Sequence, residues 1–545
     1  MTGAPNPTPL VVCGDVITMD AARPRVEAVA IAAGRVVATG SRSQALASVP
    51  AGTPTLELPG TVVPGLVDSH VHMLWGGRAS ERLEVSDAAS VAELLQRVRE
   101  FAAANPGSPW LAGTAGLDPE DLAEGRFPTA AELDEATGGR PLFLDRRSHD
   151  ALVSGAALAA AGIGPGTADP VGGVIERDPG GAPTGLLIER PAAELVERRM
   201  PAPSTADRLR WLAAIQPRFL AAGITTVLDP ALEPEEIVAY ATAAERGLLQ
   251  LRATGMPLGD GEVPPAERAA AFAAAGADLA DRDGERWRVG PWKLFLDGGG
   301  SLGTALLYEP WPGSDDYLGN QTTTTAALRE YAVWAAETEA GLGVHCVGSA
   351  AIDLFIEACE GAARVRPLQG LGFTIIHAYL WPSAEQMRRI RELDVLVATQ
   401  SPLQWSFGAG LVRRFGADAV GRAHPLRSWL RSGAIVGGGS DGTGYGVEPP
   451  VEPLWAFWQM RRRTIEGGAE PVGPEEAIDA EQALALYTTG AAAVAMAPDR
   501  GRLAPGTVAD LAALEVDPLR ASPEACREAG VLATMVGGEL VHDAR

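Results

Sequence analysis

The sequence predicts an α/β fold: a (β/α)8 barrel of the TIM type, with a composite β-sandwich from both termini and an inserted lobe. Short apolar segments alternate with alanine-rich helical stretches, which is the rhythm of a parallel barrel. There are eight such segments, the number that this barrel requires. We expect the strands at residues 61–72, 224–229, 249–255, 292–298, 342–346, 373–378, 394–400 and 433–441.

The two ends of the chain resemble each other in texture. Apolar, β-branched runs broken by glycine and proline fill the first 60 residues, and similar runs return near the C-terminus. Such runs are typical of short antiparallel strands, and segments at opposite ends of a chain can pair. We therefore expect one part of a β-sandwich at residues 1–60, the barrel at 61–498 and the second part of the sandwich at 499–545.

A long insertion separates the first and second expected barrel strands. It covers about residues 76–205, is rich in glycine and proline, and contains one further strand-like run at 141–149. This length is too great for a single βα loop. We expect a lobe that covers the mouth of the barrel.

The composition of the chain limits which partners it can bind and in which cellular compartment we expect it. The formal net charge is −24, from 45 basic and 69 acidic residues, which argues against nucleic acid or an anionic membrane surface. The four cysteines lack CxxC spacing, which excludes a common type of zinc site and indicates a reducing compartment. No secretory signal or membrane span is evident. We expect a cytoplasmic protein acting on a small molecule; its oligomeric state stays open, with a homodimer as the candidate.

Histidine placement is the strongest chemical signal. Only seven histidines occur, and His70 and His72 lie two residues apart at the end of an apolar strand. Residues two apart on a strand point to the same face, so both imidazoles converge on one point. Two neutral imidazoles on one face can chelate a divalent metal.

Three further strands end in candidate ligands: His345, His377 and Asp441. The C-terminal ends of the strands are where barrel active sites are built. A lone histidine at a strand end is more often a core residue than a ligand. The joint pattern favours a metal site, because a purely structural explanation has to account for each coincidence separately.

Lys293 is the only lysine in the chain, on the fourth expected strand. A position that keeps lysine where all other basic side chains are arginine indicates a need for a compact amine that can be deprotonated and modified. If CO2 carboxylates this amine, Lys293 becomes an anionic ligand that bridges two metals about 3.5–4 Å apart. A substrate-binding lysine and a structural salt bridge stay open as alternatives.

The ordered motifs PGLVDSHVH, WKLFLDG, VHCVG, IIHA, GGSD and GRLAPGTVADLAAL resemble those of the amidohydrolase superfamily. They are similar in particular to the YtcJ-like branch that includes N-substituted formamide deformylases, over nearly the whole chain. The resemblance implies one or two zinc ions and hydrolysis of an amide or related C–N bond, with Asp441 as both ligand and general base. The implied metal ligands are His70, His72, Lys293, His345, His377 and Asp441.

The sequence departs from the branch around these ligands. Ser349 stands where the fifth-strand motif usually has aspartate, Ile376 where the sixth usually has glutamate, and Gly442 where tryptophan tends to follow Ser-Asp. The segment that begins at Asp297 also lacks the usual downstream arginine. The ligands are kept while the surrounding residues differ, so the sequence supports metal chemistry better than any one substrate.

The expected mechanism uses metal-bound hydroxide on an amide, formamide or cyclic amide. Asp441 orients the hydroxide, accepts its proton and passes it to the departing amine. His149 lies in a segment that resembles a part of the lobe reaching the active site, and it is the candidate for oxyanion stabilisation or substrate contact. Trp75 and Trp405, near strand ends, are candidates for an aromatic substrate wall. His424 and His542 lie away from strand ends and are expected to take no part.

Three other functions stay open. The segment around Ser440 matches G-x-S-x-G, but the serine hydrolase order needs a later histidine, and the only one, His542, is three residues from the end. A catalytically decayed binding protein is a second alternative, motivated by the altered motifs. The third is a non-hydrolytic enzyme of the same fold, namely a deaminase, isomerase or decarboxylase, since fold does not fix function.

Overall fold

The computed structural model describes residues 8–146, 150–170, 173–281, 284–444 and 450–545. The chain divides into two compact units. The first comprises residues 1–74, 209–444 and 448–545, and the second comprises residues 75–208 with 445–447.

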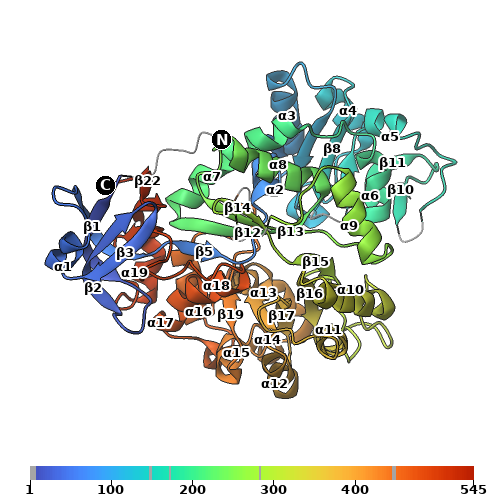
Figure 1. The fold of residues 1–545 in the computed structure, drawn as a ribbon. Helices are drawn as coiled ribbons and strands as arrows, with labels where there is room; N and C mark the ends of the chain where they lie inside the picture. The colour runs from blue at the N-terminus through green and yellow to red at the C-terminus, as the bar shows by residue number, and fades with distance from the viewer. Residues whose placement is uncertain (1–7, 147–149, 171–172, 282–283, 445–449) are drawn as a thin grey trace. The chain divides into compact units, whose positions relative to one another are not determined.

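Strands from both ends of the chain form one sheet in the first unit, and they lie side by side in Figure 1. The predicted pairing of segments from opposite ends of the chain is present, because β4 pairs with β1 on one side and with β20 on the other. The β-sandwich itself stays a prediction. The order of the sheet is β22 (Glu539–Asp543), β21 (Val531–Val536), β20 (Leu511–Leu514), β4 (Thr55–Pro64), β1 (Leu10–Ile17), β2 (Arg25–Ala32) and β3 (Arg35–Gly40). The helices α1 (Arg42–Ala47) and α19 (Pro523–Glu528) accompany it.

Two parallel sheets form the rest of the first unit's strands. One has the order β14 (Trp287–Val289), β13 (Arg252–Pro257), β12 (Ile224–Leu232) and β5 (Leu66–Asp68). The other has the order β15 (Trp292–Phe295), β16 (Leu342–Gly348), β17 (Thr374–Leu380), β18 (Leu396–Thr399) and β19 (Val436–Gly438). Every residue of β12 and of β17 is buried, which explains why these strands read as apolar runs.

Helices alternate with these strands and confirm the α/β class. Polar caps begin several of them; Ser383, for example, accepts from the backbone of Gln386, whose side chain binds back to the cap. The helices are α7 (Thr205–Ala221), α8 (Pro234–Glu245), α9 (Pro265–Ala274), α10 (Thr325–Glu337), α11 (Ser349–Ala363), α12 (Ala384–Glu392), α13 (Ser401–Phe415), α14 (Ala417–Gly421), α15 (Leu426–Ser432), α16 (Pro453–Arg462), α17 (Ala480–Leu486) and α18 (Thr489–Val494).

Backbone hydrogen bonds connect the two parallel sheets at two places. The N–H of Gly259, which follows β13, donates to the carbonyl of Lys293 on β15 over 2.8 Å. The N–H of Ser69, which follows β5, donates to the carbonyl of Gly438 on β19 over 3.1 Å. The first and last expected barrel strands are thereby adjacent.

The strand expected at residues 61–72 is divided at Gly65 between two sheets: β4 ends at Pro64 and β5 begins at Leu66. The Gly65 N–H donates to the carbonyl of Asp510 over 2.9 Å. A Cβ atom at this glycine would lie 2.2 Å from Thr225 Oγ1. The chain passes from one sheet to the other through a space that admits no side chain.

The second unit has its own six-stranded sheet and core. The sheet order is β10 (Val174–Arg177), β11 (Pro183–Ile188), β9 (Asp150–Val153), β8 (Leu142–Arg146), β7 (Leu111–Thr114) and β6 (Leu83–Glu84). Its helices are α3 (Val91–Ala104), α4 (Ala130–Thr137), α5 (Gly155–Ala160) and α6 (Arg190–Glu197), while α2 (Met73–Ser80) begins at the unit boundary. Within the strand-like run expected at 141–149, Leu142–Arg146 form β8, and residues 147–149 lie outside the described residues.

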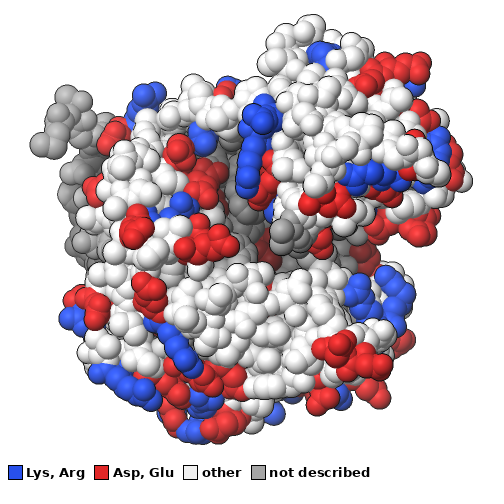
Figure 2. Space-filling model, turned by 90° about the vertical axis from the view of Figure 1, so that its right-hand side faces the viewer, with Lys and Arg blue, Asp and Glu red and all other residues white. Residues whose placement is uncertain are grey.

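Charged side chains of both signs are interspersed on the face of the molecule in Figure 2. Many arginines pair with neighbouring carboxylates; Arg388, for example, bonds to Glu385 and Glu392 on the same helix. Among the described residues, no helix has both the length and the apolar character that crossing a bilayer requires.

Candidate metal centre

His70, His72 and Asp441 lie just beyond the C-terminal ends of their strands, whereas Lys293, His345 and His377 lie within β15, β16 and β17. His70 and His72 follow β5, and Asp441 follows β19. The Asp441 N–H donates to the carbonyl of His70 over 2.8 Å, and the His72 N–H donates to the carbonyl of Gly442 over 3.0 Å. These two segments are therefore held side by side.

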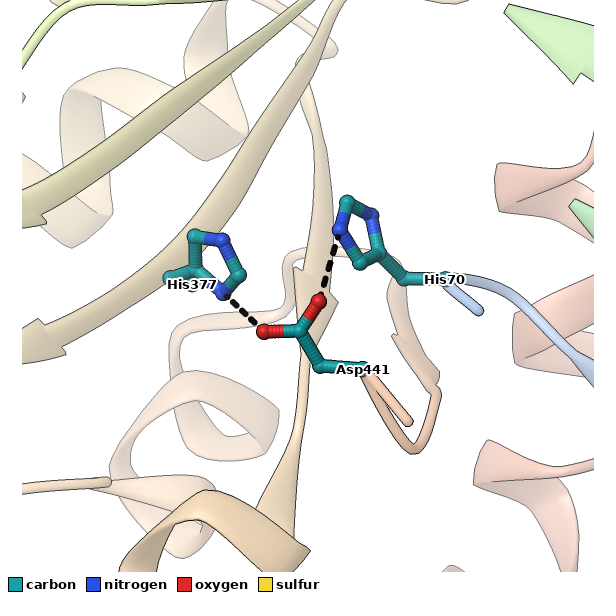
Figure 3. Close-up of side chains that lie close together, drawn as sticks. All are labelled: His70, His377 and Asp441. Carbon is teal, nitrogen blue, oxygen red and sulfur yellow. Dashed lines mark ion pairs between the residues drawn. The ribbon is translucent and has the colours of Figure 1, made fainter. Parts of the chain in front are cut away.

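Three of the candidates converge on one point: His70, His377 and Asp441. The carboxylate of Asp441 lies between the two imidazoles, with one oxygen 3.2 Å from His70 Nε2 and the other 4.0 Å from His377 Nδ1 (Figure 3). One possible ligand atom from each residue lies within 4.8 Å of the others. His70 and His377 are buried, and Asp441 is partly exposed.

His72 joins this group from the strand end that it shares with His70. Its Nε2 lies 3.5 Å from Asp441 Oδ1, the same oxygen that faces His70. The His70 and His72 rings meet edge to face, with centroids 5.5 Å apart. The predicted convergence of the two imidazoles therefore holds in the structure.

The ring of His345 lies beside the ring of His377, with the two ring centroids 4.5 Å apart. Its Nε2 faces a different carboxylate, at 3.7 Å from Asp297 Oδ1, and lies 3.4 Å from the carbonyl of Gly298. The structure thus places His345 beside the cluster while directing one of its nitrogens to the loop after β15.

Lys293 is fully buried on β15, and its Nζ has no hydrogen-bond partner among the described residues. The amine lies 4.8 Å from the centroid of the Phe295 ring. Burial lowers the pKa of Lys293 to about 7, although Asp441 and Cys346 oppose this shift. A buried amine without a partner is costly and requires an explanation.

Burial also keeps the imidazoles neutral. It lowers the pKa of His70 to about 4 and that of His345 to about 3, with Lys293 adding to both shifts, and it lowers the pKa of His377 well below its usual value. Burial would raise the pKa of Asp441, but the neighbouring imidazoles, His377 first, outweigh it and hold that pKa well below its usual range. Neutral imidazoles around an ionised carboxylate are the protonation states that a cation needs.

The donors fit a divalent metal ion. Imidazole nitrogens with a carboxylate oxygen are the usual set for zinc and related ions. Within the described part of the chain, His70 Nδ1 and Lys293 Nζ are buried polar atoms that no protein group satisfies. Unsatisfied buried polar atoms of this kind are expected where an ion, a water molecule or a ligand completes the site.

Three buried aspartates support the centre and were not predicted from the sequence. Asp68 accepts from the backbone N–H groups of His70 and Ser440, which ties β5 to β19. Asp229 accepts from the N–H of Leu74 and from the hydroxyl of Tyr240. Burial raises the pKa of Asp68 to about 7 and that of Asp229 to about 6.

Asp297, the third of these aspartates, fixes the loop after β15. Its carboxylate accepts from the backbone N–H groups of Leu306, Val347 and Gly348, each over 2.9 Å. Burial raises its pKa to about 7. All three aspartates occur at or near strand ends, so the rule that selected the histidines also applies to them.

The described part of the structure does not join the three substrate-binding candidates Trp405, Trp75 and His149 to the metal cluster. Trp405 packs edge to face against Trp455, with centroids 5.3 Å apart, and lines a cavity of about 810 Å³ with Trp458 and Arg461; the candidate ligands are not among its lining residues. Trp75 belongs to the second unit. His149 lies outside the described residues. Substrate binding by these three residues stays a prediction.

The two remaining histidines, His424 and His542, pack within the fold away from the candidate ligands. His424 is buried and stacks on Tyr379 with ring centroids 4.2 Å apart. His542 lies on β22 opposite Thr534. The serine hydrolase alternative needs His542 beside Ser440. Ser440 is buried and its backbone N–H donates to Asp68, whereas His542 lies on β22, the outermost strand of the seven-stranded sheet. These positions give that alternative no support.

Comparison with known proteins agrees with this geometry. The model of the "Amidohydrolase family" matches residues 60–542. The chain is 27% identical to an N-substituted formamide deformylase of Arthrobacter pascens, over 98% of both chains. It is 28% identical to a putative amidohydrolase, YtcJ, of Bacillus subtilis, over 97% of this chain and 98% of that one. A solved metal-dependent hydrolase from Pyrococcus furiosus is 25% identical, with a TM-score of 0.75 over 94% of this chain and 100% of that one.

Proposed function

We propose that this chain, which belongs to the amidohydrolase family, is a metal-dependent hydrolase that cleaves an amide-type C–N bond. The observation that carries the proposal is the convergence of His70, His377 and Asp441 within 4.8 Å of one another. The name of the formamide deformylase relative supports an amide, a formamide or a cyclic amide as the substrate.

In this proposal the scaffold is a closed (β/α)8 barrel. The eight strands β5, β12, β13, β15, β16, β17, β18 and β19 follow one another in chain order with helices between them. The bonds from Gly259 to Lys293 and from Ser69 to Gly438 join the two parallel sheets and support this closure. Active sites of such barrels lie at the C-terminal ends of the strands, and His70, His72 and Asp441 lie just beyond such ends.

His70, His72, His377 and Asp441 would hold the metal, and His345 would complete the set for a second ion. Zinc fits these donors best, since imidazole and carboxylate ligands suit it. Lys293 would serve as a bridging ligand after its amine takes up CO2, which its burial and lowered pKa favour. A bound divalent ion supplies Lewis acidity and lowers the pKa of a coordinated water molecule.

The protein's own groups then manage the proton. The Asp441 carboxylate, ionised and partly exposed, accepts a proton from the attacking water at Oδ1 or Oδ2 and delivers it to the nitrogen of the departing amine. Asp68 keeps Asp441 in place because it binds the backbone of both His70 and Ser440. The C–N bond breaks as the protonated amine leaves, and the carbonyl carbon gains the hydroxyl group.

The test combines metal analysis with one substitution. Asp441→Asn is expected to keep at least one metal per chain and to lose about 10²–10⁴-fold in kcat, the usual worth of a general base. Asp315→Asn, at an exposed position, is the matched control and is expected to leave turnover unchanged. A panel of amides, formamides and lactams supplies the assay.

Either of two results contradicts the proposal. Wild-type protein that holds less than one metal ion per chain after zinc supplementation removes the metal-dependent mechanism. Near-normal turnover of Asp441→Asn removes Asp441 as the base while leaving the metal centre in place.

A further inference from the structure

Gln400 occupies a strand end that the proposed mechanism does not use. It is the first residue after β18 and the N-terminal cap position of α13, and it is buried. Its Oε1 lies 2.7 Å from His377 Nδ1. This is a hydrogen bond of normal length, whereas the same nitrogen is 4.0 Å from Asp441.

The chemistry of the pair fixes the form of the imidazole. A histidine that binds a metal ion is neutral, and a neutral imidazole has one N–H donor and one lone pair. An amide oxygen is only an acceptor, so the Gln400 Oε1 requires the proton on Nδ1. The lone pair is then on Nε2, the nitrogen that this tautomer makes available to a metal.

The backbone holds both partners in place. The Leu403 N–H donates to the carbonyl of Gln400, and the Gly439 N–H donates to the carbonyl of Thr399, the residue before it. His377 has a backbone φ of 75°, a left-handed conformation that is uncommon for a residue other than glycine. Such strained positions concentrate at functional sites, where the surroundings enforce them.

The amide nitrogen of Gln400 indicates that packing of the core alone does not explain this residue. Its Nε2 is buried and has no partner among the described residues. An unsatisfied buried N–H group lowers the stability of the fold, so an apolar side chain of similar size would be the more stable choice for packing alone. The presence of a polar amide here is explained by its bond to His377.

We infer that Gln400 is a positioning residue for the metal centre: its Oε1 selects the Nδ1–H tautomer of His377, which leaves the lone pair on Nε2 to bind the ion. This inference rests on the proposed function, because it concerns the same centre. Partners of this kind orient a ligating histidine, and their loss typically costs about 10–100-fold in metal affinity.

The experiment measures zinc affinity of the full chain by competition with a chromophoric chelator. Gln400→Met removes the acceptor and is expected to weaken zinc binding about 10–100-fold. Gln400→Glu keeps an acceptor oxygen at the same position and is expected to restore the affinity. Gln404→Met is the matched control, because Gln404 is a buried glutamine one turn further along α13 that binds the carbonyl of Val472.

The cobalt(II)-substituted proteins provide a second readout, since the visible absorption of cobalt reports its ligands independently of turnover. A changed spectrum in Gln400→Met that reverts in Gln400→Glu supports the inference. Equal zinc affinity and an unchanged spectrum in Gln400→Met overturn it, as does a loss that Gln404→Met reproduces. Wild-type protein that binds no metal overturns the proposed function itself, which separates the two failures.

Discussion

The buried ion pair between Arg252 and Asp510 offers a quantitative test of how the C-terminal segment is attached. Arg252 belongs to β13, and Asp510 directly precedes β20. The pair is bidentate, with Nε to Oδ2 at 2.7 Å and Nη2 to Oδ1 at 3.0 Å, and the side chains are 3% and 4% exposed. Asp510 also accepts from the N–H of Gly537 over 2.7 Å, so its carboxylate is fully occupied.

Removing one partner leaves the other charge buried without compensation. Arg252→Met is therefore expected to lower the free energy of unfolding by about 3–5 kcal/mol at pH 7. The double variant Arg252→Met with Asp510→Asn is expected to recover part of this loss. The uncompensated charge is then gone, and the amide side chain introduced in its place still offers an oxygen to the Gly537 N–H. Urea unfolding followed by tryptophan fluorescence gives the three free energies.

The dependence on pH has a definite sign. Burial raises the pKa of Asp510, but the ion pair with Arg252 outweighs burial, so the pKa is lowered in the folded state. The ionised carboxylate therefore stabilises the fold at pH values above its ordinary pKa of about 3.9. That contribution disappears as the pH falls through the lowered folded-state pKa. In Arg252→Met, only the Gly537 N–H and Arg500 oppose the effect of burial, so the pKa of Asp510 rises and the gap to wild type should narrow on acidification. A gap below about 1 kcal/mol at pH 7, within the range of an exposed pair, would refute the reasoning.

Two further substitutions probe the packing and the site. Gly65→Ala is expected to lower the free energy of unfolding by about 1–3 kcal/mol, because its Cβ would lie 2.2 Å from Thr225 Oγ1. Thr225→Ala should recover part of this loss, since a contact of 2.9 Å with the Asp510 Cβ remains. Gly107→Ala is the control, with nothing within 4 Å, and equal losses at both glycines in urea unfolding contradict the packing argument. Lys293→Met should not lower stability, since it removes a buried amine without a described partner, yet it should abolish turnover and reduce the metal content. Unchanged turnover would exclude Lys293 from the site.

The positions of the parallel strands could be predicted because these strands are buried on both faces. Continuous apolar runs such as Ile224–Leu232 mark them regardless of their neighbours. The passage from β4 to β5 could not be predicted, because Val62 and Val67 are equally apolar on either side of it. Only the contact of Gly65 with Thr225, a residue distant in sequence, shows where one sheet ends and the next begins.

The convergence of three candidate ligands could be predicted for a related reason. His70 and Asp441 lie just after buried apolar strands and His377 lies within one, and the strands of a parallel sheet bring such positions together. Asp297 and Gln400 stand at equivalent places, yet their roles depend on which atoms they face: three backbone N–H groups for one and a single ring nitrogen for the other. Such pairings are set by side-chain direction, which residue order does not reveal.

The pairing of the chain's two ends determines when the centre can exist during synthesis. Ser69 and Gly438 are hydrogen-bonded to each other but are separated by 369 positions in the sequence. The second edge of β4 pairs with β20, which is synthesised near the end of the chain. A ribosome has therefore released most of the chain before any metal can be held, and until then β4 presents an unpaired apolar edge that includes Val62 and Val63. Unpaired strand edges of nascent chains favour aggregation, so we expect the yield of active protein to respond to chaperone supply more than its final stability would suggest.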